Sequence, residues 1–227
     1  MEKRSDRQLQ NVLLGATSPG LVHFAVNRKG ILGMYIAIVT GSTRPGRNNI
    51  AVARWVLELA AKRADASFEL VDIADYQLPL LDESIPPVVG RYSHAHTKRW
   101  AAKIASFDGY VFVAPEYNHG TSAALKNAID YLYAEWNDKA AGFVSYGAVG
   151  GVRAVEHLRL VMGNLMVADV TRQVMLSLFT DFENMSVFRP DPRHEAELHA
   201  MLDQVIAWAG ALKPLRSAKD ASLAQAA

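Results

Sequence analysis

Hydrophobic and polar positions follow two alternating periods along most of this chain. Residues 35–41 (YIAIVTG) form an apolar, β-branched run ending at glycine, which predicts a strand buried on both faces. Residues 49–63 then carry apolar side chains at spacings of three and four, which predicts a helix with one buried face. The two patterns recur in turn, with strands predicted at 68–73, 109–114, 140–146 and 165–170 and helices at 97–107, 123–133, 151–162 and 195–212.

Strands that alternate with helices predict an α/β fold with a parallel sheet covered on both faces. Ligands of such sheets bind beyond the carboxyl ends of the strands, so we expect the chemistry in the loops that follow strands. Residues 1–33 have weak periodicity and are predicted to be an irregular N-terminal extension. The main domain is expected at 34–187, followed by a C-terminal helix and tail at 188–227.

Composition narrows the classes of function. The 24 Lys and Arg residues nearly balance 23 Asp and Glu, which gives no reason to expect nucleic acid or an anionic membrane as partner. The chain contains no cysteine, which excludes disulfides, thiolate metal sites and cysteine nucleophiles, so redox chemistry would need a bound cofactor. No apolar run approaches the roughly 20 residues of a membrane helix, and the polar start resembles no secretory signal. We predict a cytoplasmic location.

The first loop after a predicted strand, residues 41–49 (GSTRPGRNN), has the groups that bind a phosphate. Ser42 offers a hydroxyl, Arg44 and Arg47 offer charged donors, and the following helix offers free N–H groups. The loop matches neither GxGxxG nor GxxxxGK[ST], which favours a monophosphate over a dinucleotide. The alternative is a plain turn with solvated arginines, in which Ser42 or Asn49 only caps the helix.

The second loop follows the strand that ends at residue 114. Pro115 restricts the backbone, Tyr117 supplies an aromatic wall, Asn118 donates and accepts hydrogen bonds, and Gly120 permits close approach of a ligand. A flat heteroaromatic ring suits these groups. In the alternative interpretation this is an ordinary loop, Tyr117 packs on the core, and Thr121 or Ser122 is a helix N-cap.

The third loop, residues 145–154 (SYGAVGGVRA), brings glycine amides near a ligand. Gly147, Gly150 and Gly151 would present N–H groups to ring carbonyls and Ser145 a hydroxyl. Taken alone, the pattern also fits a glycine-rich turn with Arg153 as a surface charge. Three such loops at three successive strand ends converge on one crevice, which favours a binding site.

Other conspicuous side chains are interpreted as structural. His94, His96 and His119 lack partners at a recognisable metal-ligand spacing, and solvated or rim positions are expected for them. Trp100, Trp136 and Tyr131 would suit the wall of an acceptor site, but aromatic residues on amphipathic helices more often pack in the core. No metal ligand is predicted.

The segments GSTRPGR, LVDIADYQLPLLDE, PEYNHGTSAALKNAID and SYG followed by GG resemble the NADPH-dependent FMN reductase family, over about residues 34–170. PEYN with the Lys and Asn that follow in the helix is the most specific of these motifs. The resemblance implies a flavodoxin-like three-layer sandwich with a five-stranded parallel sheet in the order 2-1-3-4-5. It also implies a homodimer or homotetramer.

The resemblance further implies FMN as cofactor and NADPH or NADH as electron donor. The FMN phosphate would lie in the first loop, with Arg47 standing where many relatives have serine. The isoalloxazine ring would lie against the second and third loops, with Glu116 acting through its backbone. The cofactor-binding residues that we predict are Ser42, Arg44, Arg47, Asn49, Pro115, Glu116, Tyr117, Asn118, Ser145 and Gly147.

The predicted function is therefore hydride transfer from NAD(P)H to bound FMN and then to a small acceptor: free flavin, a quinone, an azo or nitro compound, or a metal ion. Because the cofactor performs the chemistry, no catalytic acid or base is predicted. One alternative is an FMN-binding electron carrier or regulatory protein without steady nicotinamide turnover. Another is an interaction domain that kept only the fold.

Overall fold

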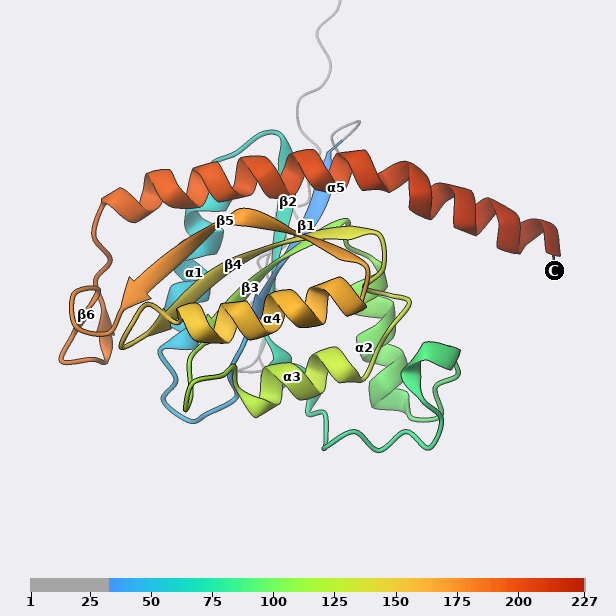
Figure 1. Cartoon of the computed structure of the whole chain (residues 1–227), viewed down its shortest axis with the longest axis horizontal. Coiled ribbons are helices and arrows are strands. Elements are labelled where there is room, and N and C mark those ends of the chain that lie inside the picture. Colours follow the sequence, from blue (N-terminus) through green and yellow to red (C-terminus); the bar gives the residue numbers. More distant parts are fainter. Residues whose placement is uncertain (1–32, 227) are drawn as a thin grey trace, which may run out of the picture.

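The computed structural model describes residues 33–226, with side chains as far as residue 218, so the predicted extension lies outside the described residues except for its last residue. Five parallel strands form one sheet in the order β2-β1-β3-β4-β5, which confirms the predicted flavodoxin-like topology (Figure 1). The large sheet contains β1 (Met34–Thr40), β2 (Ala66–Val71), β3 (Gly109–Pro115), β4 (Lys139–Gly147) and β5 (Val167–Ser177). The helices are α1 (Asn49–Ala60), α2 (Ala95–Ala105), α3 (Ala123–Asp130), α4 (Val152–Asn164) and α5 (Arg193–Ala226), with two 3-10 turns, η1 (Ile73–Tyr76) and η2 (Pro87–Val89).

The two central strands β3 and β4 are buried along their whole length. Both are covered on two faces, which explains why their sequences are continuously apolar instead of alternating. Their pairing is in register from Gly109↔Ala140 to Pro115↔Tyr146. This register sets the carboxyl ends of β3 and β4 side by side, so the loops that follow them start as neighbours.

The helices divide between the two faces of the sheet (Figure 1). Side chains of α1 and α5, such as Val52 and Leu202, belong to one buried cluster. Side chains of α2, α3 and α4, such as Trp100, Leu125 and Leu158, belong to the other. The sheet with its two helical layers is therefore the predicted three-layer sandwich.

The aromatic residues Trp100, Trp136 and Tyr131 are fully buried, which confirms the packing interpretation. The indole of Trp100 donates a hydrogen bond to the Ala128 carbonyl at 2.7 Å, and that of Trp136 donates to the Ile129 carbonyl at 3.1 Å. These bonds satisfy the buried N–H groups and fix α3 against its neighbours. The two indoles belong to the core.

The fifth strand is longer than predicted, reaching Ser177 instead of residue 170. Its pairing with β4 shifts from Ala141↔Asp169 to Phe143↔Gln173, so extra residues on β5 form a bulge. Arg159 of α4 fills this place with a hydrogen bond to the Val170 carbonyl at 2.9 Å and an ion pair to Asp169. The bulge interrupts the apolar pattern and hides the second half of the strand in the sequence.

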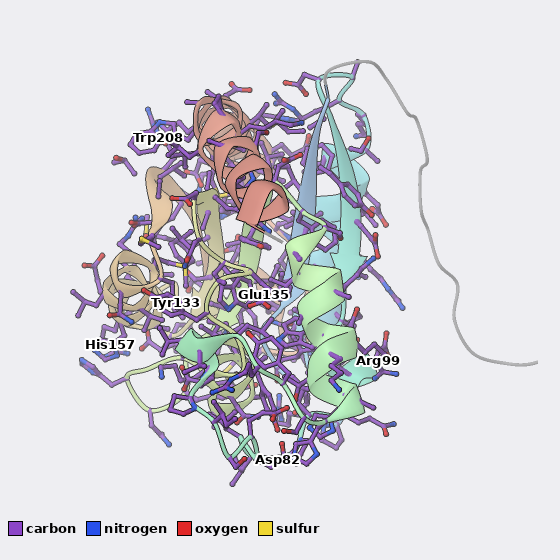
Figure 2. The ribbon with its side chains drawn as sticks, turned by 90° about the vertical axis from the view of Figure 1, so that its right-hand side faces the viewer. Asp82, Arg99, Tyr133, Glu135, His157 and Trp208 are labelled. Carbon is purple, nitrogen blue, oxygen red and sulfur yellow. The ribbon has the colours of Figure 1, made fainter. Side chains whose placement is uncertain are left out.

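The last helix is also longer than predicted and continues through Pro214 to Ala226. Its apolar pattern stops near residue 212, but Arg216 holds the next turn against the sheet. The guanidinium donates to the Asp138 carbonyl at 2.6 Å and pairs with Asp108. Farther back on the helix, Trp208 points away from the sheet and is half exposed (Figure 2).

A short antiparallel ribbon, β6 (Phe182–Glu183) and β7 (Val187–Phe188), lies between β5 and α5. The Asn48 amide donates to the Met185 carbonyl in its turn at 2.9 Å, which connects the ribbon to the start of α1. Among the described helices, none combines the length and the apolar character that crossing a membrane requires. The cytoplasmic location stays a prediction, and so do the domain limits.

Candidate functional site

The first loop is shaped by Asn49, the first residue of α1, whose side chain is fully buried. Its Oδ1 accepts a hydrogen bond from the Gly41 N–H at 2.8 Å, and its Nδ2 donates to the Val113 carbonyl at 2.8 Å. Both polar atoms thus serve protein groups at the ends of β1 and β3. Asn49 ties the first loop to the neighbouring strand.

The N-terminus of α1 faces this loop and is suited to an anion. Its N-cap residue, Asn48, makes no side-chain capping bond, and the first turn contains no acidic residue. Arg44 is exposed in the loop, and its N–H donates to the buried Ser42 hydroxyl at 3.3 Å. The helix dipole and the exposed guanidinium both favour a negative charge at this place.

Arg47, the other predicted phosphate ligand, is directed elsewhere. Its guanidinium forms an ion pair with Asp72, which follows β2. Asp72 also accepts a hydrogen bond from the Thr40 hydroxyl at 2.8 Å and caps η1 through the Ala74 N–H at 3.1 Å. Arg47 therefore links the first loop to the end of β2, and its contact with a phosphate stays a prediction.

The second loop begins with a tight hairpin from Tyr117 to Gly120. The Tyr117 N–H donates to the Gly120 carbonyl at 2.9 Å, and the reverse bond measures 3.2 Å. Asn118 and His119 occupy the two central positions with φ of 49° and 74°, as a type I′ turn requires. The turn exposes Asn118 and directs the Tyr117 hydroxyl to within 3.0 Å of Ser42 Oγ, so the first and second loops meet.

Ser122 joins these loops a second time. Its hydroxyl oxygen accepts a hydrogen bond from the Leu125 N–H at 3.0 Å as the N-cap of α3, and the same hydroxyl donates to the Gly41 carbonyl. Gly41 is packed so closely that a Cβ would lie 2.4 Å from the Val113 carbonyl oxygen. The N-cap interpretation of Ser122 is confirmed, and the same hydroxyl also fixes the first loop.

Glu116 connects the second loop to the helix after the third. Its backbone N–H donates to the Tyr146 carbonyl at 3.0 Å, so this N–H is engaged within the protein. Its carboxylate accepts hydrogen bonds from the Arg153 Nε at 2.6 Å and from the Arg153 backbone N–H at 3.2 Å. The Glu116 side chain is 4% exposed. Arg153 thus fixes the second loop through a partner 37 residues away. No local sequence pattern predicts this role.

The third loop is held by hydrogen bonds between its own residues. The Ser145 hydroxyl donates to the Gly150 carbonyl at 2.6 Å, which uses the group that was expected beside the ring. The Gly147 carbonyl accepts from the Gly150 N–H at 3.2 Å and from the Leu178 N–H at 3.0 Å. Gly151 has φ of 72°, and a Cβ there would lie 2.7 Å from the Tyr146 nitrogen, so only glycine fits.

Tyr146, between these residues, has a buried hydroxyl with no hydrogen-bond partner among the described residues. The residue is 5% exposed and sits at the carboxyl end of β4. Burial raises the pKa of Tyr146 well above its ordinary value. The sequence motif SYG contains this tyrosine, but within that motif the sequence indicates roles only for Ser145 and Gly147.

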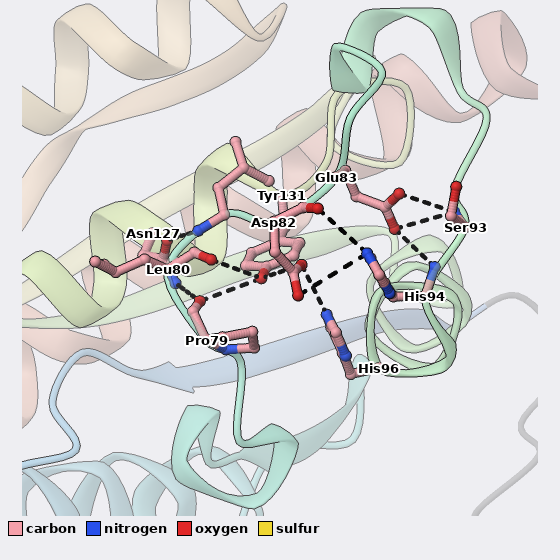
Figure 3. A network of polar contacts seen from close by, with 10 residues as sticks. Pro79, Leu80, Asp82, Glu83, Ser93, His94, His96, Asn127 and Tyr131 are labelled. Atoms are coloured by element: carbon pink, nitrogen blue, oxygen red, sulfur yellow. Dashed lines mark hydrogen bonds and ion pairs between the residues drawn. The ribbon is translucent and has the colours of Figure 1, made fainter.

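His94 and His96 lie apart from the three loops, in the segment that covers α3 (Figure 3), whereas His119 lies in the turn of the second loop. His96 Nε2 lies 3.0 Å from Asp82 Oδ1, and the His94 ring stacks on that of His96 with centroids 5.1 Å apart. The Tyr131 hydroxyl donates to the same carboxylate at 2.9 Å. No set of three or more His, Asp or Glu side chains in the described part of the chain is arranged to hold a metal ion.

Glu83 holds the start of α2 in the same segment (Figure 3). Its carboxylate accepts hydrogen bonds from the backbone N–H groups of Ser93 and His94, at 2.8 and 3.0 Å. Desolvation raises the pKa of this carboxyl, but the neighbouring donors, chiefly these two N–H groups, outweigh it and lower the pKa to about 2. The segment is a structural cover and lies outside the cluster of the three loops.

The donor set at the carboxyl ends of the strands fits an aromatic phosphate monoester. An anion would meet the start of α1, Arg44 and the unpartnered Tyr146 hydroxyl. The adjoining Tyr117 and Asn118 offer an aromatic ring and an amide at the mouth of the second loop. These two chemistries share one place because Ser42 and Tyr117 are in contact.

Comparisons with known proteins place the chain among flavin-dependent relatives. The family described as NADPH-dependent FMN reductase matches residues 34–181. An NAD(P)H-dependent FMN reductase of Schizosaccharomyces pombe is 40% identical over 148 residues, which are 64% of this chain and 74% of that protein. One of a Nectria species is 43% identical over 137 residues, 56% of this chain and 68% of that protein.

Solved structures confirm the fold. The flavoenzyme NAD(P)H:(acceptor) oxidoreductase of Paracoccus denitrificans superimposes with a TM-score of 0.61 at 19% identity. The match covers 78% of this chain and 97% of that one. At this identity the similarity supports the arrangement of strands and helices alone.

Proposed function

This chain belongs to the NADPH-dependent FMN reductase family, and from that premise we propose that it binds FMN and passes electrons from NAD(P)H to a small acceptor. The observation that carries the proposal is the contact of 3.0 Å between Ser42 Oγ and the Tyr117 hydroxyl. Through it, a loop suited to phosphate and a loop suited to a flat ring become one site. Bound FMN would supply the two-electron redox chemistry, and the chain binds and orients it.

The predicted site residues have different roles under this proposal. Ser42, Arg44 and the start of α1 hold the phosphate, while Pro115, Tyr117 and Asn118 border the ring. Gly147 lets the third loop approach, because a Cβ there would lie 3.0 Å from the Glu116 Cβ. The other predicted residues position the loops through their protein partners: Arg47, Asn49, Glu116 and Ser145.

Two exposed apolar side chains beside the third loop support a flat, apolar acceptor such as a quinone. Val149 is 52% exposed within the loop, and Phe179 is 68% exposed directly after Leu178, whose N–H donates to the Gly147 carbonyl. Surfaces of this kind favour aromatic molecules over small polar ones. Free flavin, azo and nitro compounds and metal ions remain the other acceptors to assay.

The test is the visible absorption spectrum of the purified protein, with FMN added if none is retained. NADPH and then NADH are added under anaerobic conditions. A flavin spectrum bleached by either nucleotide supports the proposal, and reoxidation by each acceptor then ranks the acceptors. Bound flavin that nucleotide does not bleach supports the electron carrier or regulator instead. A protein that binds no FMN overturns the proposal.

We also propose that the chain forms a homodimer or homotetramer. The described surface supports this through two highly exposed leucines: Leu160 of α4 is 78% exposed, and Leu80, in the segment between η1 and η2, is 82% exposed. Light scattering coupled to gel filtration measures the mass directly. A monomer at micromolar concentration would overturn this part of the proposal.

A further inference from the structure

The buried hydroxyl of Tyr146 at the site has no hydrogen-bond partner among the described residues. The Tyr146 hydroxyl lies inside the protein with the residue 5% exposed, yet no described group forms a hydrogen bond with it. Buried tyrosine hydroxyls nearly always have such a partner, because removing the group from water without one is unfavourable. The unpartnered hydroxyl therefore indicates a missing acceptor.

The position of the Tyr146 ring is fixed by packing. Its centroid lies 5.9 Å from that of Phe182 in β6, on the face of the sheet that α1 and α5 cover. Its backbone carbonyl accepts the Glu116 N–H at 3.0 Å, so the residue is held at the sheet end as well. The hydroxyl cannot leave this place without disturbing the core.

The groups nearest the Tyr146 hydroxyl already have other hydrogen-bond partners. Asn49 lies next to it, but the Asn49 amide already bonds Gly41 and Val113 through both polar atoms. Tyr117 is also near, and its hydroxyl is in contact with Ser42. Arg44 is a donor with no acceptor to offer. What the place lacks is an acceptor, and the surrounding cation and helix N-terminus favour an anionic one.

We propose that Tyr146 is a further cofactor-binding residue, whose hydroxyl donates a hydrogen bond to the phosphate of FMN. The inference rests on the proposed function. The inference adds a phosphate ligand at the carboxyl end of β4 to the ligands that we propose in the first loop. A phosphate dianion has only acceptor oxygens, so the tyrosine must be protonated to bind it. Burial, which raises the pKa of Tyr146, keeps it so.

The experiment compares FMN with riboflavin, which lacks the phosphate. Apoprotein of the wild type and of Tyr146→Phe is titrated with each flavin, and binding is followed by the change in flavin fluorescence. Phenylalanine keeps the ring and its contact with Phe182. The dissociation constant of FMN should rise at least about tenfold, since the lost bond is to a charged group. That of riboflavin should stay within about twofold, because it has no phosphate to lose.

A control variant is Tyr133→Phe, which removes a hydroxyl whose one described contact is the Asn164 carbonyl at 3.4 Å. It should bind both flavins like the wild type. The melting temperature gives a second measurement. Tyr146→Phe apoprotein should melt no lower than wild-type apoprotein, because the change removes an unsatisfied buried group. A clearly lower value would show that the hydroxyl has a protein partner and would overturn the inference.

The remaining outcomes separate the inference from the proposed function. If the wild type binds no FMN, the proposed function fails and the inference falls with it. If the wild type binds FMN and Tyr146→Phe binds it equally well, only the inference fails. Equal weakening of FMN and riboflavin would place the hydroxyl at the ring or ribityl chain and overturn the phosphate assignment.

Discussion

The Arg153 guanidinium forms an ion pair with the buried Glu116 carboxylate. This contact joins the second loop to α4, the helix that follows the third loop. Arg153→Ala should lower the free energy of unfolding by about 1–2 kcal/mol, because Glu116 then stays buried with one remaining N–H partner. FMN affinity should fall as the two loops separate. Urea unfolding and flavin titration measure the two effects.

The double variant Glu116→Gln with Arg153→Ala tests the cause of that loss. It should recover part of the stability, since no buried charge is left without its partner. Arg54→Ala, an exposed arginine on α1, is the matched control and should change neither quantity. If the single and double variants were equally destabilised, the ion pair would not be the cause.

The two arginines of the first loop should behave differently. Arg44→Ala should weaken FMN binding by about 1.5–3 kcal/mol without altering stability, because Arg44 is exposed and faces the proposed phosphate. Arg47→Ala should mainly lower stability, by roughly 1 kcal/mol, because it releases Asp72 from its ion pair. Titration calorimetry and thermal melts distinguish the two. The reverse order of affinities would assign the phosphate to Arg47.

His119 occupies a backbone position that favours glycine. Its φ of 74° at the second central position of the hairpin is uncommon for a side chain of this size. His119→Gly should raise the free energy of unfolding by roughly 1 kcal/mol through relief of this strain. Asn118→Gly should gain less, because asparagine tolerates the left-handed region. Chemical denaturation of both variants measures these changes. A loss of stability in His119→Gly would show that the backbone at this position is not strained.

Lys139 gives the protein a pH dependence of stability. Burial, together with the nearby Arg216, lowers the pKa of Lys139 from 10.5 to about 7. Between these values the unfolded chain binds more protons than the folded one, so the free energy of unfolding should rise with pH. The Lys139 contribution is present above pH 10.5 and is lost as the pH falls through 7.

The measurement is guanidinium unfolding of the wild type and Lys139→Met at pH 7 and pH 9. The free energy of unfolding of the wild type should rise relative to that of the variant by about 1 kcal/mol per pH unit. The Nζ donates to the carbonyls of Ile104 and Ala105 and to the Tyr110 hydroxyl, and these bonds favour the charged ammonium and keep the gain below the limiting slope. Parallel curves for the two proteins would show that Lys139 keeps an ordinary pKa.

The sequence predicts best where a pattern reflects burial alone. The central strands β3 and β4 lie within two residues of their predicted limits, because both faces of each are covered. The second half of β5 is hidden by the bulge at Asp169, and α5 continues past residue 212 because Arg216 pairs with Asp108. Both differences come from tertiary contacts that a local pattern does not contain.

The same division applies to the candidate site. Its loops and residue types follow from the sequence and the family resemblance, but the partner of each side chain does not. Asn49 bonds Val113, 64 residues away, and Arg47 pairs with Asp72, 25 residues away. Tyr146 is distinguished only by the absence of a partner among the described residues, which no sequence pattern expresses.

The bonds that Asn49, Ser122 and Glu116 make around the three loops all have partners in the protein itself. The conformational entropy of ordering these loops is therefore lost during folding and not during ligand binding. Such preorganisation lets most of the contact energy appear as affinity. Under the proposed function, chemically altered flavins of the same shape as FMN should therefore bind these preformed loops, and each would give the protein a different reduction potential without any change to the chain.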